Sequence, residues 1–253
     1  MRWLPRLAVT ASLLLGIFAA STQTSSQAQE PGFSPEQTQA IETIVRDYLI
    51  AHPEVIKEAI QALQAKEEAA EANLQASALT QHRDRLFADP LAPVAGNPVG
   101  DVTIVQFFDY KCPYCKRVTP ALTELLASDK GIKLVYKEFP ILGESSLVAA
   151  RAALAAVAQD RYFDLHDALM AHRGDFDLAT IQTIAANLGL DGERLLADMK
   201  SDAIDSQLRD NHELAIALSI RSTPTFVIGD QIVPGALSID DMRALIADIR
   251  SGS

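Results

Sequence analysis

Residues 101–116 read Asp-Val-Thr-Ile-Val-Gln-Phe-Phe-Asp-Tyr-Lys-Cys-Pro-Tyr-Cys-Lys, and they join an apolar run to a pair of cysteines. The run from Val102 to Phe108 is rich in β-branched and aromatic residues, which is typical of a buried strand. Cys112 and Cys115 follow closely and are the only two cysteines in the chain of 253 residues. With no third cysteine available, the two form one chemical unit, either a dithiol/disulfide couple or half of a metal site.

A metal site at these cysteines would need two further ligands. The sequence offers five histidines, none at a compact spacing from the cysteines: His52, His82, His166, His172 and His212. We therefore favour a redox-active dithiol and expect neither a metal nor a cofactor. A copper(I) site shared between the thiolates of several subunits is an alternative that nothing else in the sequence supports.

The N-terminus has the features of an export signal. Arg2 and Arg6 precede an uncharged apolar stretch from Leu7 to Ala20, and polar residues follow up to a small-residue site at 26–28. This pattern predicts a secretory signal peptide over residues 1–28, and therefore a periplasmic or exported protein. The alternative is a membrane anchor, but a spanning helix needs about 20 apolar residues, more than this stretch contains.

The chain carries an excess of acidic residues. Removal of residues 1–28 takes away two of the 22 basic residues and none of the 33 acidic ones, which changes the formal net charge from −11 to −13. Such a surface argues against nucleic acid or anionic lipid as a partner.

An N-terminal helical segment is expected over residues 29–88. Its first apolar face recurs every three or four residues and comprises Ile41, Ile44, Val45, Tyr48 and Leu49. Pro53 interrupts this helix, and a second one follows with a weak heptad of Ile56, Ile60, Leu63, Ala70 and Leu74. Two partners for these apolar faces remain open, namely the rest of the same domain or other copies of the chain in an oligomerisation stalk.

The rest of the chain indicates an α/β class. The strand, the Cys-x-x-Cys pair, a helix and a second strand at 132–139 form the start of a thioredoxin-like βαβ unit. A purely helical pattern follows, with Asp177 and Asp191 placed as N-caps, before short strands return at 225–228 and 231–233. We therefore predict a thioredoxin-like fold with an inserted helical domain, preceded by the N-terminal helical segment. The thioredoxin-like domain is assigned to 89–142 and 219–253 and the insertion to 143–218, with 89–98 as a linker or a lead-in strand.

The two cysteines are placed for different roles. Cys112 stands where the first turn of a helix begins, so unpaired backbone N–H groups and the helix dipole would stabilise its thiolate. Cys115 lies one turn further along and is expected to be more buried, as the resolving thiol. Pro113 suits the first turn because no N–H is needed there. Lys111 adds a favourable charge if it points inward, although a lysine at such a position is more often solvated.

Thr223 and Pro224 stand just before the strand at 225–228, where proline takes either a cis bond in a tight loop or an ordinary trans bond. Together with the motif at 107–115, the stretch Tyr-Lys-Glu-Phe-Pro-Ile-Leu-Gly at 136–143 and the helical insertion, this element resembles the DsbA family of thioredoxin-fold thiol-disulfide oxidoreductases. The resemblance covers residues 90–250.

This resemblance implies a role for each site residue. Cys112 is the attacking, solvent-facing thiolate, Cys115 resolves the mixed disulfide, and Pro224 is cis and faces the pair across the active-site groove. Thr223 would offer backbone hydrogen bonds to an extended substrate segment. Pro113 and Tyr114 differ from the Pro-His pair of the best-known member, and this dipeptide tunes the stability of the thiolate.

A second difference from the family is the position six residues before the first cysteine, where related proteins often bury an acid. Here it is Gln106, which cannot accept a proton from Cys115. Glu138, at the end of the next predicted strand, is a candidate for that role. We slightly favour the alternative that Glu138 is an exposed carboxylate or a partner of Lys137.

The N-terminal helices further resemble the stalk of DsbA-like proteins of the suppressor-of-copper-sensitivity type, some of which trimerise. The resemblance implies an exported enzyme that acts on unfolded or misfolded secreted proteins and exchanges electrons with a membrane redox partner. A homotrimer would favour disulfide isomerisation or reduction, and a monomer would leave dithiol oxidation. The alternatives from other classes are a redox-independent holdase chaperone and a copper-handling protein.

Overall fold

The structure of the protein is a computed structural model, and it describes residues 32–252. The described residues fall into two compact units, which divide after Ala62. The signal peptide predicted over residues 1–28 lies outside the described residues. Within 32–252, no helix combines the length and the apolarity that crossing a membrane requires.

In the first unit, helix α1 (Pro35–Ala51) ends where the sequence predicts a break. Ser34 caps its start, because the Ser34 Oγ accepts from the Gln37 backbone N–H at 3.2 Å while the Gln37 side chain accepts from the Ser34 N–H at 2.9 Å. The C-cap is His52, and α2 (Glu54–Gln81) begins directly after Pro53.

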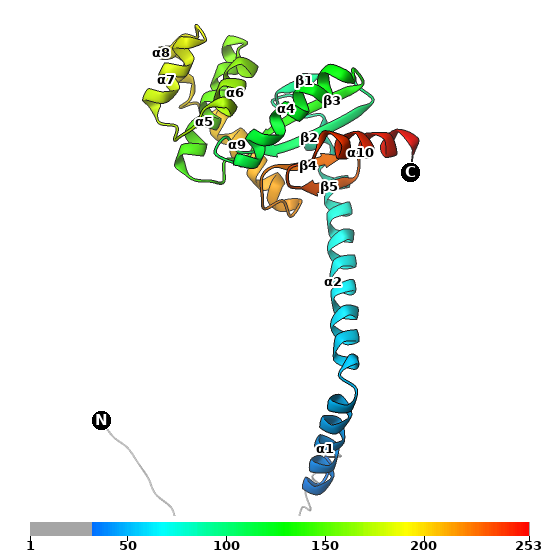
Figure 1. Cartoon of the computed structure of the whole chain (residues 1–253). Coiled ribbons are helices and arrows are strands. Elements are labelled where there is room, and N and C mark those ends of the chain that lie inside the picture. Colours follow the sequence, from blue (N-terminus) through cyan, green and yellow to red (C-terminus); the bar gives the residue numbers. More distant parts are fainter. Residues whose placement is uncertain (1–31, 253) are drawn as a thin grey trace, which may run out of the picture. The chain divides into compact units, whose positions relative to one another are not determined.

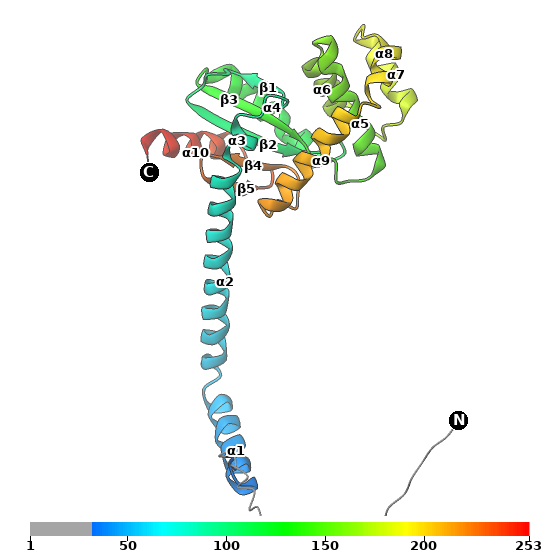
Figure 2. The same cartoon turned by 180° about the vertical axis from the view of Figure 1, so that it is seen from behind.

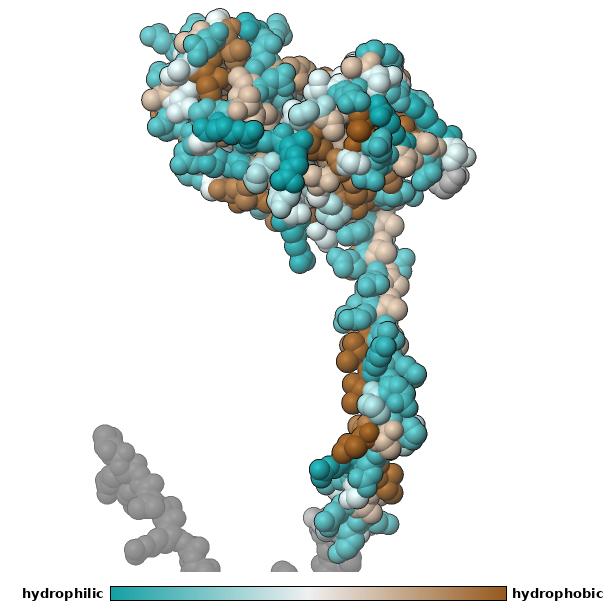
Figure 3. All heavy atoms as spheres, in the orientation of Figure 1, coloured by the Kyte–Doolittle hydropathy of each residue, from teal (hydrophilic) through white to brown (hydrophobic). Residues whose placement is uncertain are grey.

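The apolar face of the first unit is exposed. No residue of α1 is buried, and Tyr48 and Ile60 remain 53% and 51% exposed. Figure 3 shows brown, hydrophobic side chains along these helices. The exposed apolar residues of this unit include Ile41, Ile44, Val45, Tyr48, Ile56 and Ile60.

The part of α2 in the second unit packs on its own domain only near its end. Leu79 joins a buried cluster with Leu86 of α3 (Arg83–Phe87). Leu63 and Leu74, in contrast, are 55% and 72% exposed. Within the second unit, the chain's own domain therefore leaves the heptad residues Leu63 and Leu74 uncovered.

The second unit is built on a five-stranded sheet with the order β1-β3-β2-β4-β5 (Figure 1). The central β2 (Val102–Phe108) is parallel to β3 (Ile132–Glu138), and α4 (Pro113–Ser128) connects them, which confirms the predicted βαβ unit. The short strand β1 (Val94–Gly96) is antiparallel to β3, so the segment before β2 is a lead-in strand.

The C-terminal part of the sheet is a hairpin. β4 (Thr225–Ile228) is antiparallel to β2 and to β5 (Gln231–Pro234), as the sequence predicts. In the register of the parallel pair, Phe108 lies beside Glu138. The loop that carries the cysteines and the end of β3 therefore lie at the same edge of the sheet.

Helices cover both faces of the sheet, and the second face packs partly on the insertion. On one face, Ile104 and Phe108 pack with α4 and with α10 (Ile239–Ser251). On the other face, Val105 and Phe107 pack with α3 and with α9 (Asp202–Ala217). Burial on both faces explains why β2 is a continuous apolar run rather than an alternating one.

A block of helices lies between β3 and β4 in the sequence, and both views place α6, α7 and α8 beyond one end of the sheet (Figures 1 and 2). The predicted caps are confirmed, because Asp177 accepts from the Thr180 N–H at 2.7 Å and Asp191 from the Arg194 N–H at 3.0 Å. The helices of the block are α5 (Glu144–Ala155), η1 (Ala156–Gln159), α6 (Tyr162–Ala171), α7 (Leu178–Asn187), α8 (Gly192–Asp198) and α9.

Candidate active site

Cys112 is the N-cap residue of α4, where the sequence placed it. Its Sγ accepts a hydrogen bond from the backbone N–H of Cys115 at 3.4 Å, so it satisfies one of the unpaired donors of the first turn. Pro113 occupies the first turn, as predicted. Both cysteines are free thiols and both are buried, Cys115 completely and Cys112 at 3% exposed. The expectation that Cys112 faces solvent is therefore wrong, because the loop at Thr223 packs against its sulfur.

The two thiols differ strongly in acidity. The pKa of Cys112 is lowered from its ordinary 9.0 to about 6, chiefly by the hydrogen bond from the Cys115 side chain. Partial burial opposes this lowering of the pKa. Hydrogen bonds from the Thr223 side chain and from the backbone N–H groups at Cys115 and Tyr114 add to it. Burial raises the pKa of Cys115, and its bond to Cys112 raises it further. At neutral pH Cys112 is therefore a nucleophilic thiolate while Cys115 keeps its proton.

The loop before β4 meets the cysteines. The Thr223–Pro224 peptide bond is cis, and Pro224 is buried. The Cys112 Sγ lies 3.1 Å from the Thr223 carbonyl oxygen, to which it donates when it is protonated. Two chain segments 111 residues apart thus meet at the reactive sulfur.

The residues that flank the cysteines are partly exposed. Tyr114 is 52% exposed, and the Arg117 guanidinium lies over its ring at 4.9 Å. Lys111 pairs with Asp175 and donates to the Gly174 carbonyl oxygen at 3.0 Å, so it is neither fully solvated nor directed at Cys112.

Lys116 contributes a second amine near the site. Its Nζ donates to the carbonyl oxygens of Leu169 and His172, at 3.1 and 2.6 Å. Burial, with the nearby charges of Arg173 and Lys111, lowers its pKa to about 8.

Asp109 holds the loop between β2 and α4, a role that the sequence analysis did not assign. Its buried carboxylate accepts from the backbone N–H groups of Lys111, Ile141 and Leu142 at 2.7 to 3.0 Å. It also accepts from the Ser146 hydroxyl at 2.7 Å. A short acidic side chain directly after a buried strand is the available sequence signal, since aspartate commonly accepts from the backbone N–H two residues on.

Glu138 is neither an exposed carboxylate nor a partner of Lys137, so the interpretation that we favoured is wrong. It is 1% exposed, and Lys137 pairs instead with Asp89, at 2.5 Å between Nζ and Oδ2. The Glu138 Oε1 lies within hydrogen-bond distance of the hydroxyls of Tyr110 and Tyr162, at 2.9 and 2.8 Å. Tyr162 lies in the insertion, 24 residues further along the chain, so no local sequence pattern predicts this contact.

Gln106 is buried in β2 on the face that packs against α4, because it alternates with Ile104 and Phe108. Neither its Oε1 nor its Nε2 has a hydrogen-bond partner among the described residues. The position that related proteins fill with an acid thus holds a neutral side chain.

No group of three or more potential metal ligands occurs within residues 32–252.

Comparison with known proteins identifies two family segments. Residues 103–247, more than half of the chain, match the DSBA-like thioredoxin domain. Residues 37–70 match the N-terminal domain of the copper resistance protein ScsC.

Solved structures agree with both matches. A thioredoxin-like oxidoreductase from Silicibacter pomeroyi is 43% identical, with a TM-score of 0.66 over 68% of this chain and 99% of that one. ScsC from Proteus mirabilis, in a transitional conformation, is 32% identical, with a TM-score of 0.64 over 88% and 99%. The thiol-disulfide exchange protein α-DsbA2 from Wolbachia pipientis is 32% identical, with a TM-score of 0.66 over 71% and 98%.

Curated relatives include much longer proteins. The Na(+)/H(+) antiporter NhaA 1 of Salinispora arenicola is 32% identical over 165 residues, which are 63% of this chain and 25% of the antiporter. The chain therefore spans about a quarter of the length of such relatives. From its fold, its site and the matches over 103–247 and 37–70, the chain belongs to the DsbA-like thioredoxin family and carries an N-terminal segment of the ScsC type.

Proposed function

We propose that the chain is a thiol-disulfide oxidoreductase that exchanges disulfides with protein substrates through Cys112 and Cys115. The Cys112 thiolate attacks a substrate disulfide, which forms a mixed disulfide and releases one substrate thiolate. Cys115 then loses its proton and attacks the Cys112 sulfur. The second substrate thiolate leaves, the cysteine pair is oxidised, and the substrate is reduced by two electrons. The reverse sequence introduces a disulfide.

One observation carries this proposal, namely the position of Cys112 at the N-terminus of α4 against the Thr223 carbonyl. The helix start and the buried Cys115 thiol stabilise the Cys112 thiolate, and the second thiol is held one turn away. Thr223 and Pro224 form the adjacent wall, where an extended substrate segment would add its backbone hydrogen bonds.

The test is turnover of a scrambled-disulfide protein by the mature chain and by two single variants. Cys112→Ser should abolish activity, because it removes the attacking sulfur. Cys115→Ser should instead accumulate a mixed disulfide at Cys112, visible by mass spectrometry and cleaved by reductant. Full activity of Cys112→Ser would refute the proposal.

We propose further that the protein acts outside the cytoplasm, on unfolded or misfolded secreted proteins, and that a membrane protein sets its redox state. The predicted signal at residues 1–28 supports export, and so does the similarity to a periplasmic thioredoxin-like protein of Salmonella enterica. Detection of the processed chain in a periplasmic fraction, with a new N-terminus near residue 29, tests the location.

We also propose a homotrimer assembled through the N-terminal helices. The uncovered apolar residues of α1 and α2 support it, together with the ScsC-type match over 37–70. Light-scattering mass of the mature protein with and without residues 29–80 tests assembly. A monomer in both cases would remove the argument for isomerisation over oxidation.

A copper-handling role is a second candidate, because the N-terminal match is to a copper resistance protein. Two soft thiolates suit copper(I). This candidate predicts copper(I) binding that disappears when Cys112 and Cys115 are both replaced by serine, and disulfide exchange that copper(I) inhibits.

A further inference from the structure

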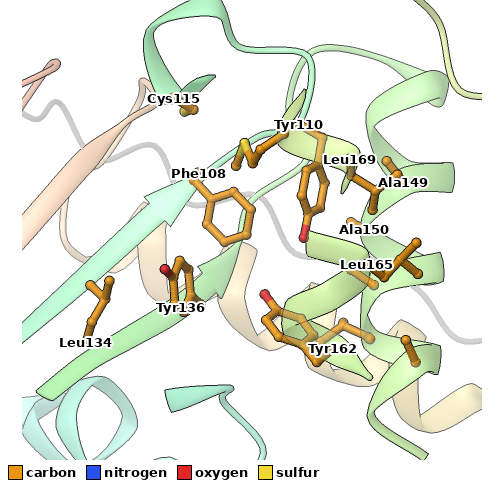
Figure 4. Packing of buried hydrophobic residues seen from close by; sticks show 14 of the residues in the cluster. Phe108, Tyr110, Cys115, Leu134, Tyr136, Ala149, Ala150, Tyr162, Leu165 and Leu169 are labelled. Carbon is orange, nitrogen blue, oxygen red and sulfur yellow. The ribbon is translucent and has the colours of Figure 1, made fainter. Parts of the chain in front are cut away.

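A buried polar cluster joins three elements beside the active-site loop. Tyr110 belongs to the loop between β2 and α4, Glu138 ends β3, and Tyr162 and His166 lie on α6. All four side chains are less than 5% exposed. Figure 4 shows the hydroxyls of Tyr110 and Tyr162 pointing into the same space between the sheet and the helices.

The hydrogen bonds of this cluster constrain its protons. The Tyr110 hydroxyl lies 2.9 Å from the Glu138 Oε1 and 2.9 Å from the His166 Nδ1, but it has only one proton to donate. If the carboxyl is protonated on Oε1, it donates to Tyr110, which donates to the neutral imidazole, while Tyr162 donates to Oε1. Every contact is then satisfied without a charge. If Glu138 is ionised, both tyrosines donate to it, and His166 must place its own proton on Nδ1.

The surroundings favour the uncharged arrangement. Glu138 Oε2 has no hydrogen-bond partner in the described part of the chain, and no basic group pairs with this carboxyl. The neighbouring Lys137 pairs with Asp89 instead. The negative charge of Asp109 repels an ionised Glu138 and so favours its neutral form. Burial raises the pKa of Glu138 well above its ordinary value and lowers the pKa of His166 to about 3. An ionised carboxylate without a cation would be costly here, whereas a hydrogen-bonded neutral acid is not.

We propose that Glu138 is a neutral positioning residue, which holds the hydroxyls of Tyr110 and Tyr162 and so fixes the Cys112 loop against the helical insertion. Tyr110 precedes Cys112 by two residues, and the Cys112 backbone N–H bonds to the Asp109 carbonyl oxygen at 3.1 Å. The loop is thus held on one side by the Asp109 carboxylate and on the other by the Tyr110 hydroxyl. The Cys112 sulfur then stays in reach of the Cys115 N–H and the Thr223 carbonyl.

This inference rests on the proposed thiol exchange for its consequence, and it replaces the role of proton acceptor for Glu138. Among the described residues, no hydrogen bond joins Glu138 to either cysteine, and the carboxyl reaches the loop through the Tyr110 hydroxyl. A proton acceptor has to be ionised before exchange, whereas a positioning acid keeps its proton throughout. The two roles therefore predict opposite behaviour for an amide at this position.

The decisive experiment compares Glu138→Gln with Glu138→Leu in the full-length mature protein. An amide has the shape of the neutral acid and keeps both acceptor and donor, so Glu138→Gln should keep the exchange rate within about twofold of wild type. Leucine removes the partner of the Tyr162 hydroxyl and leaves the Tyr110 hydroxyl bonded to His166 alone, so Glu138→Leu should lose about tenfold or more in exchange rate. Exchange in Glu138→Gln as impaired as in Glu138→Leu would overturn the proposal.

Two further measurements keep the inference testable if Glu138→Leu fails to fold. Tyr162→Phe removes one hydroxyl from the insertion side, and it should move the titration midpoint of Cys112 toward its ordinary value in a folded protein. Tyr136→Phe is the matched control, because Tyr136 is a buried neighbour whose ring lies 6.3 Å from that of Tyr162 but makes no hydrogen bond to Glu138. Equal Cys112 midpoints in the two variants would contradict the positioning role.

The protonation of Glu138 has a readout that does not depend on exchange. The infrared difference spectrum between wild type and Glu138→Gln at neutral pH should contain the C=O stretch of a protonated carboxyl, and its absence would overturn the neutral assignment. If wild type itself exchanges no disulfides, the proposed function fails, while this spectrum and the Cys112 titrations still decide the state and role of Glu138.

Discussion

The acidity of Cys112 should depend on the side chain at position 115, because the largest cause of its lowered pKa is the hydrogen bond from the Cys115 side chain. Cys115→Ala removes that donor, whereas Cys115→Ser keeps a hydroxyl in the same place. A hydrogen bond to a charged group contributes about 1.5 to 3 kcal/mol, which corresponds to about one to two pKa units. From a pKa of about 6, the alanine variant should titrate near 7 to 8, and the serine variant near the wild-type value.

The assay is the pH dependence of the thiolate absorbance of Cys112, with the pH profile of alkylation as a second probe. At pH 7 the thiolate fraction should fall from about 90% in the serine variant to between about 50% and 10% in the alanine variant. The alkylation rate at one pH is a poor substitute, because the nucleophilicity of a thiolate rises with its pKa and offsets part of the change. Identical midpoints in the two variants would refute the assignment of the low pKa to Cys115 and leave the helix N-terminus as its cause.

Three further predictions follow from the same structure. Asp109→Ala should lower the free energy of unfolding in urea by about 3 kcal/mol or more, because it strands several buried donors, while Asp109→Asn should cost less. Lys137→Met alone should cost about 1 to 3 kcal/mol by thermal unfolding, and adding Asp89→Leu should recover part of this, since Lys137 is buried and Asp89 is partly exposed; full additivity would contradict the pairing. The folded pKa of Cys112 lies below its ordinary 9.0, so the thiolate should stabilise the reduced protein above that pH and lose the effect as the pH falls through about 6. Urea unfolding of reduced wild type and of Cys112→Ser across this range measures the difference, which should vanish at acidic pH.

The sequence predicts those parts of the fold that depend on local chemistry. A few adjacent residues are enough to predict the β2 strand, the helix start at Cys112 and the caps at Asp177 and Asp191. The structure confirms each of these predictions. The environment of Glu138 cannot be predicted from the neighbouring residues, because its hydrogen-bond partners come from the active-site loop and from α6. Sequence position alone makes Glu138 a strand-end carboxylate, and only the insertion of α6 beside the sheet buries it.

We propose that thiolate stability and assembly together set the direction of exchange. A low pKa at the attacking cysteine stabilises the reduced form, which makes the disulfide a stronger oxidant. The pKa of the attacking cysteine ranges from about 7 in thioredoxin to about 3.5 in DsbA. The pKa of Cys112, about 6, lies nearer the value of thioredoxin, the more reducing of the two. Only reduced Cys112 can attack a wrong disulfide, so we propose that isomerisation or reduction is favoured over oxidation if the chain assembles. Assembly through the exposed apolar face of α1 and α2 would bring several Cys112 sites to one substrate.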